Sequence, residues 1–117
     1  MKILITGANG QLGRELQRAV PSLWSVVAVN SADCDITDHS SVARLIEEVK
    51  PDAVVNCAAY TAVDRAENER EKADAVNWLA VENLARVAKA ADVALVHIST
   101  DYVFDGTSCT PYSESDA

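Results

Sequence analysis

The sequence has few cysteines and no long apolar run. Its three cysteines, Cys34, Cys57 and Cys109, are odd in number, widely spaced and form no C-x-x-C pair, so neither a disulfide framework nor a zinc knuckle is predicted. No run approaches the roughly 18 apolar residues of a membrane-spanning helix, and the apolar run at the start is too short for a signal peptide. We therefore expect a protein of the cytoplasm.

Basic residues are also in deficit. Ten Lys and Arg stand against 18 Asp and Glu, which gives a formal net charge of −8. The lysines are scattered and form no basic patch of the kind that nucleic acids and anionic membranes attract by counterion release. His39 and His97 have no acidic or thiol partner at metal-binding spacing, and His97 is more simply a packed or hydrogen-bonded histidine. The predicted partners are small molecules, with no metal, nucleic acid or membrane.

The 117 residues suffice for one domain and show no internal repeat or linker. Short apolar runs alternate with patterns of helical spacing. We expect strands at 3–5, 26–29, 53–57 and 93–98, and helices from 11 to before Pro21, from 38 to Pro51 and from about 69 to 91. From residue 99 onward the composition is typical of a loop.

Continuous apolar strands that alternate with amphipathic helices are typical of a parallel sheet with helices on both faces. The predicted fold class is α/β, a doubly wound parallel sheet that is truncated after about four strands. The expected strand order is 3-2-1-4, which would place the ends of the first and fourth strands side by side. Ligands bind at such a switch point.

Three glycines, Gly7, Gly10 and Gly13, form G-x-x-G-x-x-G directly after the first strand and at the start of the first helix. Such a turn lets the backbone approach a pyrophosphate, and the free N–H groups and dipole of the helix N-terminus favour its negative charge. The alternative is a glycine-rich turn without a ligand, which this strand–loop–helix context disfavours. The motif predicts a dinucleotide site.

The residues after the second strand bear on the choice of cofactor. Asn30 and Ser31 stand where an NAD-selective site usually carries an acidic residue for the ribose hydroxyls. Asn30 has no charge that would repel a 2′-phosphate, and no arginine stands beside it to bind one, so we expect a site that accepts both NADPH and NADH. Asp33 and Asp35 either supply a carboxylate from the loop or serve only as turn residues.

Two further strings follow the third and fourth strands. The small residues of 56–61 would let the backbone pass close to a nicotinamide ribose, although an Ala-rich strand end packed on a helix has the same composition. In 99–106, a hydroxyl just past a strand could donate a hydrogen bond to a substrate carbonyl oxygen as negative charge develops there during hydride transfer. Taken alone, an ordinary turn would explain this second string equally well.

With the glycine loop and these two strings in order, the chain resembles the dTDP-4-dehydrorhamnose reductases, which are extended short-chain dehydrogenases/reductases, over residues 1–117. The resemblance implies a Rossmann-like cofactor domain. It also implies a cytoplasmic enzyme that reduces dTDP-4-dehydro-6-deoxy-L-mannose to dTDP-L-rhamnose with NADPH or NADH. Two alternatives stay open: another extended short-chain dehydrogenase, such as a nucleotide-sugar epimerase or dehydratase, and a noncatalytic NADP-binding regulatory subunit.

The resemblance also implies roles for single residues. It places on the cofactor Gly7, Gly10, Gln11, Leu12, Gly13, Asn30, Asp35, Ile36, Ala58, Ala59, Tyr60, Thr61 and Ile98. Of these, residues 10–12 would contact the pyrophosphate, Asn30 the adenosine ribose, 35–36 the adenine and 59–61 the nicotinamide side. Thr100 would be the catalytic hydroxyl that polarises the ketone, and Asp101 would lie near the sugar.

The proton donor of the superfamily, a tyrosine in the pattern Tyr-x-x-x-Lys, has no counterpart here. None of the three tyrosines has a lysine at that spacing. We therefore expect an incomplete domain that lacks the later strands and most of the substrate region, with no reductase activity of its own. The outer edge of the fourth strand would then be unpaired, which favours self-association.

Overall fold

Four parallel strands organise the chain in the computed structural model, which describes residues 1–59, 69–100 and 103–116. The strands are β1 (Lys2–Thr6), β2 (Ser25–Val29), β3 (Ala53–Asn56) and β4 (Ala94–His97). The helices are α1 (Gln11–Ala19), α2 (His39–Val49) and a long helix composed of α4 (Arg70–Asp74), a π-helical turn η1 (Ala75–Leu79) and α5 (Ala80–Ala90). The predicted α/β class is confirmed.

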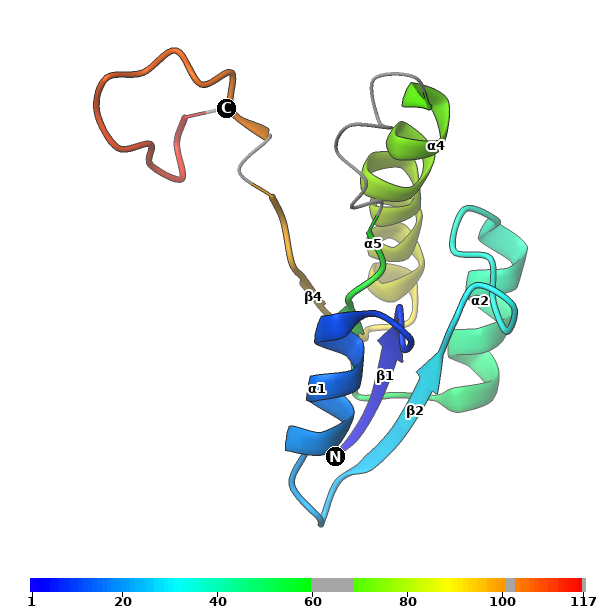
Figure 1. The fold of residues 1–117 in the computed structure, drawn as a ribbon. Helices are drawn as coiled ribbons and strands as arrows, with labels where there is room; N and C mark the ends of the chain where they lie inside the picture. The colour runs from blue at the N-terminus through cyan, green and yellow to red at the C-terminus, as the bar shows by residue number, and fades with distance from the viewer. Residues whose placement is uncertain (60–68, 101–102, 117) are drawn as a thin grey trace.

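The strand order differs from the expected one. The sheet runs β2-β1-β3-β4, so β3 lies between β1 and β4, and the predicted neighbourhood of the first and fourth strands is wrong. The reason is the face on which each helix crosses. Figure 1 shows α1 on one side of β1 and β2, with α2 and α5 on the other. A right-handed crossover through α1 on one face places β2 on one side of β1. A right-handed crossover through α2 on the other face places β3 on the other side of β1, so the switch point falls between β1 and β3.

The main core lies between the sheet and the pair α2 and α5. Leu4 and Val54 from neighbouring strands are 1% and 0% exposed and pack in one cluster with Val42, Ile46 and Leu84. Ile5 is fully buried in the middle of β1, and because strand side chains alternate it faces the side covered by α1. Strands β1 and β3 therefore hold the buried centre of the sheet.

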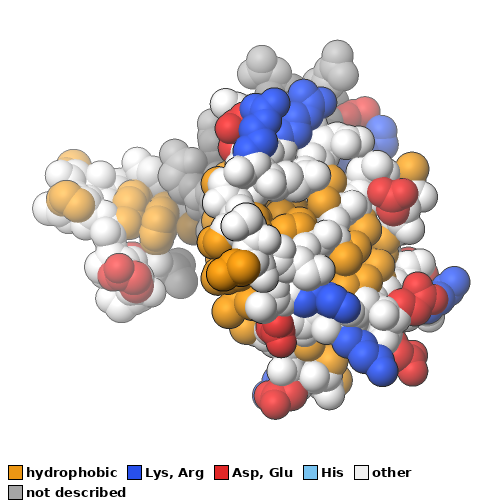
Figure 2. Space-filling view, turned by 90° about the horizontal axis from the view of Figure 1, so that it is seen from below, with side chains coloured by type: hydrophobic (Ala, Val, Ile, Leu, Met, Phe, Trp, Pro, Cys, Tyr) orange, Lys and Arg blue, Asp and Glu red, His pale blue; other side chains and the backbone are white. Residues whose placement is uncertain are grey.

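Strand β4 is less covered than the other strands. Its residues alternate between exposed and half-buried, and Val96 is 49% exposed. After β4 the chain leaves the body of the molecule, as Figures 1 and 2 show, and the stacked rings of Phe104 and Tyr112 lie 4.3 Å apart in this segment. The expectation of helices on both faces thus holds for the centre of the sheet and not for β4.

Local sequence explains the helix ends. Asp38 caps α2, since its carboxylate accepts a hydrogen bond from the Ser41 N–H at 3.0 Å. Lys50 ends α2 in the left-handed conformation directly before Pro51. None of the helices in the described part of the chain combines the length and the apolar character that crossing a bilayer requires.

Candidate functional site

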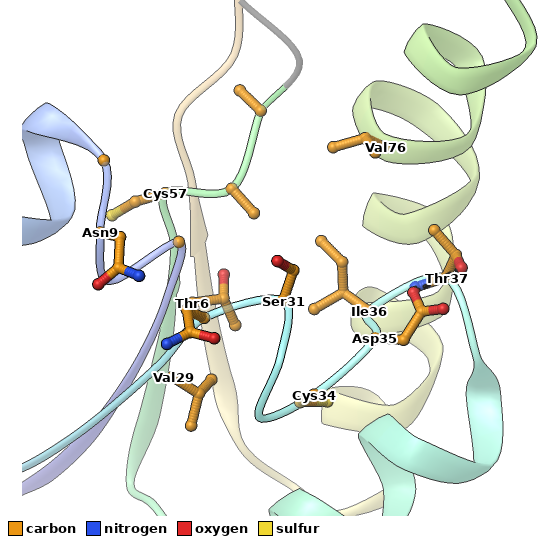
Figure 3. A pocket seen from close by; sticks show the side chains of 15 residues that line it. Thr6, Asn9, Val29, Ser31, Cys34, Asp35, Ile36, Thr37, Cys57 and Val76 are labelled. Carbon is orange, nitrogen blue, oxygen red and sulfur yellow. Dashed lines mark hydrogen bonds between the residues drawn. The ribbon is translucent and has the colours of Figure 1, made fainter.

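A cleft of about 510 Å³ opens where β1, β2 and β3 end. Figure 3 shows Asn9 and Cys57 on one side of it and Asp35, Ile36 and Val76 on the other. Its lining comes from the glycine loop, the loop after β2, the end of β3 and the long helix: Thr6, Gly7, Asn9, Gly10, Val29, Asn30, Ser31, Cys34, Asp35, Ile36, Thr37, Cys57, Ala58, Ala59 and Val76. The cleft therefore lies at the switch point of the sheet.

Two glycines of the loop are required by close packing. Gly7 has φ +69°, and a Cβ atom there would lie 2.6 Å from the Ala58 nitrogen. A Cβ atom on Gly13 would lie 2.3 Å from the Gly7 carbonyl oxygen. At Gly10 the nearest atom would be the same oxygen at 3.3 Å. The loop is thus pressed between the end of β3 and the first turn of α1, and only glycine permits this approach.

The N-terminus of α1 lacks a side-chain cap. Its N-cap residue is Gly10, and its first turn, which begins with Gln11 and Leu12, carries no acidic residue. Helix α2 differs, because Asp38 supplies a carboxylate at the same position. The first-turn N–H groups of a helix have no partner within the helix, so this end of α1 presents donors and a positive dipole end to an anion at the cleft.

A hydrogen-bond network ties three strands together beneath the cleft. The buried Asn56 is its centre: its Oδ1 accepts from the Thr6 hydroxyl at 2.6 Å and from the Ala58 N–H at 3.2 Å. Its Nδ2 lies 3.1 Å from Nδ1 of His97 on β4. The interpretation of His97 as a hydrogen-bonded histidine is confirmed. The network fixes the backbone at Ala58, which lines the cleft.

Two thiols line the cleft, and both are held in the protonated form. Burial is the largest cause that raises the pKa of Cys34, and Asp35 and Asp38 raise it further. Burial also raises the pKa of Cys57. A thiol with a raised pKa is a poor nucleophile, so these cysteines contribute apolar, uncharged walls.

The structure brings about half of the predicted cofactor residues to the cleft. Those that line it are Gly7, Gly10, Asn30, Asp35, Ile36, Ala58 and Ala59. Gln11, Leu12 and Gly13 stand directly behind the glycine loop in the first turn of α1. Tyr60, Thr61 and Asp101 lie outside the described residues.

Ile98 and Thr100 do not line the cleft and are exposed on the segment after β4. The strand order explains why they lie away from the cleft. Strand β3 stands between β4 and β1, and the glycine loop follows β1. Sequence reasoning missed Val76, which the π-helical turn directs at the cleft. In the sequence Val76 has the helical spacing of an ordinary core residue, so no pattern distinguishes it.

Known proteins resemble this chain along its whole length. The model of the family described as "RmlD substrate binding domain" matches residues 1–117. A dTDP-4-dehydrorhamnose reductase from Burkholderia thailandensis is 51% identical over 116 residues, which cover 99% of this chain and 39% of that protein.

Solved structures give the same result. A dTDP-4-dehydrorhamnose reductase from Clostridium acetobutylicum matches with a TM-score of 0.91 at 46% identity, over 100% of this chain and 42% of the other. The enzyme of that name from Bacillus anthracis, solved in complex with NADP, matches with a TM-score of 0.85 at 42% identity, over 90% and 38%. The chain thus spans less than half the length of these relatives.

Proposed function

The chain belongs to the RmlD substrate binding domain family, and on this premise we propose that it is the cofactor-binding part of an NAD(P)H-dependent reductase. The proposed reaction of the whole enzyme converts dTDP-4-dehydro-6-deoxy-L-mannose to dTDP-L-rhamnose. The observation that carries the proposal is the glycine loop, whose close packing brings an uncapped helix N-terminus to the mouth of a cleft. Names of relatives agree with it, since they are dTDP-4-dehydrorhamnose reductases.

The residues of the cleft fit a dinucleotide. The pyrophosphate would lie at the start of α1, beside Gly10, whose own N–H donates to the Gly7 carbonyl oxygen at 3.0 Å, and would bind the N–H groups of Gln11 and Leu12. The adenosine would lie between Asn30 and Ile36, where the cleft has both polar and apolar walls. Residues 58–61 would follow the nicotinamide side, in line with the small side chains at 58 and 59. The bound cofactor would supply a hydride for the ketone.

The chemistry at the ketone needs a donor for the carbonyl oxygen. In this proposal Thr100 donates that hydrogen bond, with Asp101 near the sugar and Ile98 near the cofactor. It requires the segment after β4, where Ile98 and Thr100 are exposed outside the cleft lining, to lie against the bound cofactor. A further acid must give the oxygen a proton, and the 117 residues contain no Tyr-x-x-x-Lys. We therefore expect the chain by itself to bind cofactor without turnover. NADPH oxidation that depends on the keto sugar would contradict this expectation.

Calorimetric titration of the chain with NADPH and with NADH tests the cofactor role. The informative variant is Gln11→Glu, which places a carboxylate where the pyrophosphate would bind and is favourable for the helix dipole. We expect it to weaken both affinities about 10-fold and to leave the unfolding midpoint unchanged or higher. Ser22→Glu adds the same charge in the exposed turn before β2 and should change neither affinity. Absence of binding by the parent chain would contradict the proposal.

The remaining proposals concern the binding partners, the cellular location and the self-association of the chain. A nucleotide sugar is the proposed partner of the complete enzyme, in the cytoplasm, with no nucleic acid or membrane partner. We also propose that the chain self-associates through the outer edge of β4, since β4 pairs with β3 on one side only among the described strands. Sedimentation at increasing concentration should show species larger than the monomer, and a monomer throughout would contradict self-association.

A further inference from the structure

An asparagine joins a histidine to the cleft wall at Ala58. The Oδ1 atom of Asn56 accepts from the Ala58 N–H at 3.2 Å and from the Thr6 hydroxyl at 2.6 Å. A backbone N–H can only donate, so this contact fixes the amide with its oxygen toward Ala58. The Nδ2 atom of Asn56, which also can only donate, lies 3.1 Å from Nδ1 of His97. That Nδ1 must therefore be the acceptor, and His97 is neutral with its proton on Nε2.

A second asparagine joins a second histidine to the opposite wall, at Ile36. The Nδ2 atom of Asn83 donates to the Ile36 carbonyl oxygen at 3.1 Å, and its Oδ1 lies 2.7 Å from Nδ1 of His39. A carbonyl oxygen can only accept, so Nδ1 of His39 must carry a proton. Figure 3 shows Ile36 across the cleft from Cys57, which directly precedes Ala58 in the chain. The two walls are thus held by histidines with opposite hydrogen-bonding roles.

These opposite roles make the two walls respond differently to acid. A proton added to Nδ1 of His97 would face the Nδ2 donor of Asn56, so this hydrogen bond would be lost. A proton added to His39 goes to Nε2 and leaves its Nδ1 bond to Asn83 intact. Histidine changes its charge between about pH 5 and 8. Acid should therefore loosen the wall at Ala58 and preserve the wall at Ile36.

Strand β3 and helix α5 pack against β4 and supply the neighbours of His97. The residue of β3 beside it is Asn56, a neutral amide. Helix α5 contributes apolar side chains such as Leu84 to the cluster that Leu95 of β4 joins. The charged residues of α5 are Glu82, Arg86 and Lys89. The first two form an exposed ion pair at 2.6 Å, so the contact that a proton on His97 disrupts is the one with Asn56.

We propose that His97 and His39 are positioning residues for the two walls of the cofactor cleft, and that tight binding requires the neutral form of His97. The inference rests on the proposed cofactor role and adds a proton dependence to it. The affinity for NADH should fall about 3-fold between about pH 8 and about pH 5. NADH is the suitable probe, because the 2′-phosphate of NADPH itself titrates at about pH 6.

Two-bond ¹H–¹⁵N correlation spectra of the 117-residue chain without cofactor test where the protons lie. At about pH 8 we expect a bare Nδ1 in His97 and a protonated Nδ1 in His39. A protonated Nδ1 in His97, or a bare Nδ1 in His39, would overturn the proposal whether or not the chain binds cofactor.

Calorimetric titration with NADH at the same two pH values tests the consequence for binding. In His97→Asn the side-chain oxygen takes the place of Nδ1 and accepts from Asn56 at either pH. We expect this variant to keep the parent affinity within about 2-fold at the higher pH and to lose the fall in acid. His97→Leu has no acceptor and should show the weaker binding at both pH values. Asp35 and the two thiols of the cleft are present in all of these chains, so the difference isolates His97.

His39→Asn is the matched control, since its amide N–H can replace the donor toward Asn83. It should retain the pH dependence of the parent chain. The same pH dependence in the parent and in His97→Asn would overturn the proposal while leaving the cofactor role intact. Absence of NADH binding by the parent at the higher pH would instead overturn the cofactor role, and the role of both histidines with it.

Discussion

Strands β1 and β3 contrast with β4 in how they are packed. Leu4, Ile5 and Val54 are at most 1% exposed, whereas Val96, one strand further out, is 49% exposed. The cleft follows the same division, since its walls come from the loops after β1, β2 and β3 and from the long helix. The proposed cofactor residues that line the cleft are therefore supported by a packed core, whereas Ile98 and Thr100 are exposed on the segment after β4.

The difference teaches where sequence changes should matter. On the packed side, each backbone approach and each buried polar atom has a fixed partner, so a small change has no room to relax. On the exposed side, at β4, substitution of a side chain removes few packing contacts. Four predictions test this contrast, in order of decreasing effect.

The largest effect is expected at the glycine loop. Gly13→Ala would place a Cβ atom 2.3 Å from the Gly7 carbonyl oxygen, so the loop or α1 must move. We expect a loss of about 3 kcal/mol or more in the free energy of unfolding, measured in urea. Gly10→Ala is the matched control, because its nearest contact would be 3.3 Å and its φ of −72° suits alanine. It should cost less than about 1 kcal/mol; equal losses would show that the close approach is not the cause.

The next effect concerns the buried amide of Asn56. Asn56→Leu keeps a similar volume but leaves the Thr6 hydroxyl and the Ala58 N–H without their acceptor. We expect a loss of about 2–3 kcal/mol, together with weaker NADH binding because Ala58 lines the cleft. His97→Leu removes only the outer member of the network on β4 and should cost about 1 kcal/mol. If both variants lose the same stability, Asn56 is not the centre of the network.

The third prediction compares valines on neighbouring strands. Val54→Ala removes two methyl groups from a fully buried site and should cost about 2 kcal/mol. Val96→Ala should cost less than about 0.5 kcal/mol at low protein concentration, because Val96 is half exposed. Urea unfolding at several concentrations measures both. A cost at Val96 that grows with concentration would show that a second copy covers β4, as self-association requires.

The helices and strands of this fold could be predicted from the sequence, but the order of the strands in the sheet could not. The turn at Gly7, the cap at Asp38 and the stop before Pro51 are local signals, and each element lies close to its predicted range. Strand order depends on which face α2 covers. That choice is made by packing between α2 and α5, such as Ile46 against Leu84, which no local pattern contains.

The site shows the same division. Gly7, Gly10, Asn30 and Ala58 could be predicted at the cleft because they end or follow β1, β2 and β3. Val76 could not, because a long helix must first fold over the sheet to bring it there. The order of the strands also explains why Thr100 stands away from the cleft despite its informative motif.

The smallest expected effect concerns the carboxylate that caps α2. Hydrogen bonds from the Ser41 hydroxyl and backbone hold the pKa of Asp38 below its ordinary value. A carboxyl with a lowered pKa in the folded state stabilises the protein above its unfolded-state pKa, and this contribution disappears as the pH falls through the folded-state pKa. Asp38→Ala should therefore lower the unfolding midpoint by a few degrees at pH 7 and by less in acid, where the part of the cap that depends on ionisation is lost.

Asp38→Asn separates the charge from the hydrogen bond, because asparagine also caps helices. It should retain most of the midpoint at pH 7 and show a difference from Asp38→Ala that does not vanish in acid. A deficit of Asp38→Ala that stays constant from pH 7 to pH 2 would mean that the ionised cap is not its source. That outcome would also weaken the comparison between the two helix N-termini. In α2 the Asp38 carboxylate accepts from the first-turn N–H groups, whereas the N-terminus of α1 has no side-chain cap, and we assign its N–H groups to the pyrophosphate.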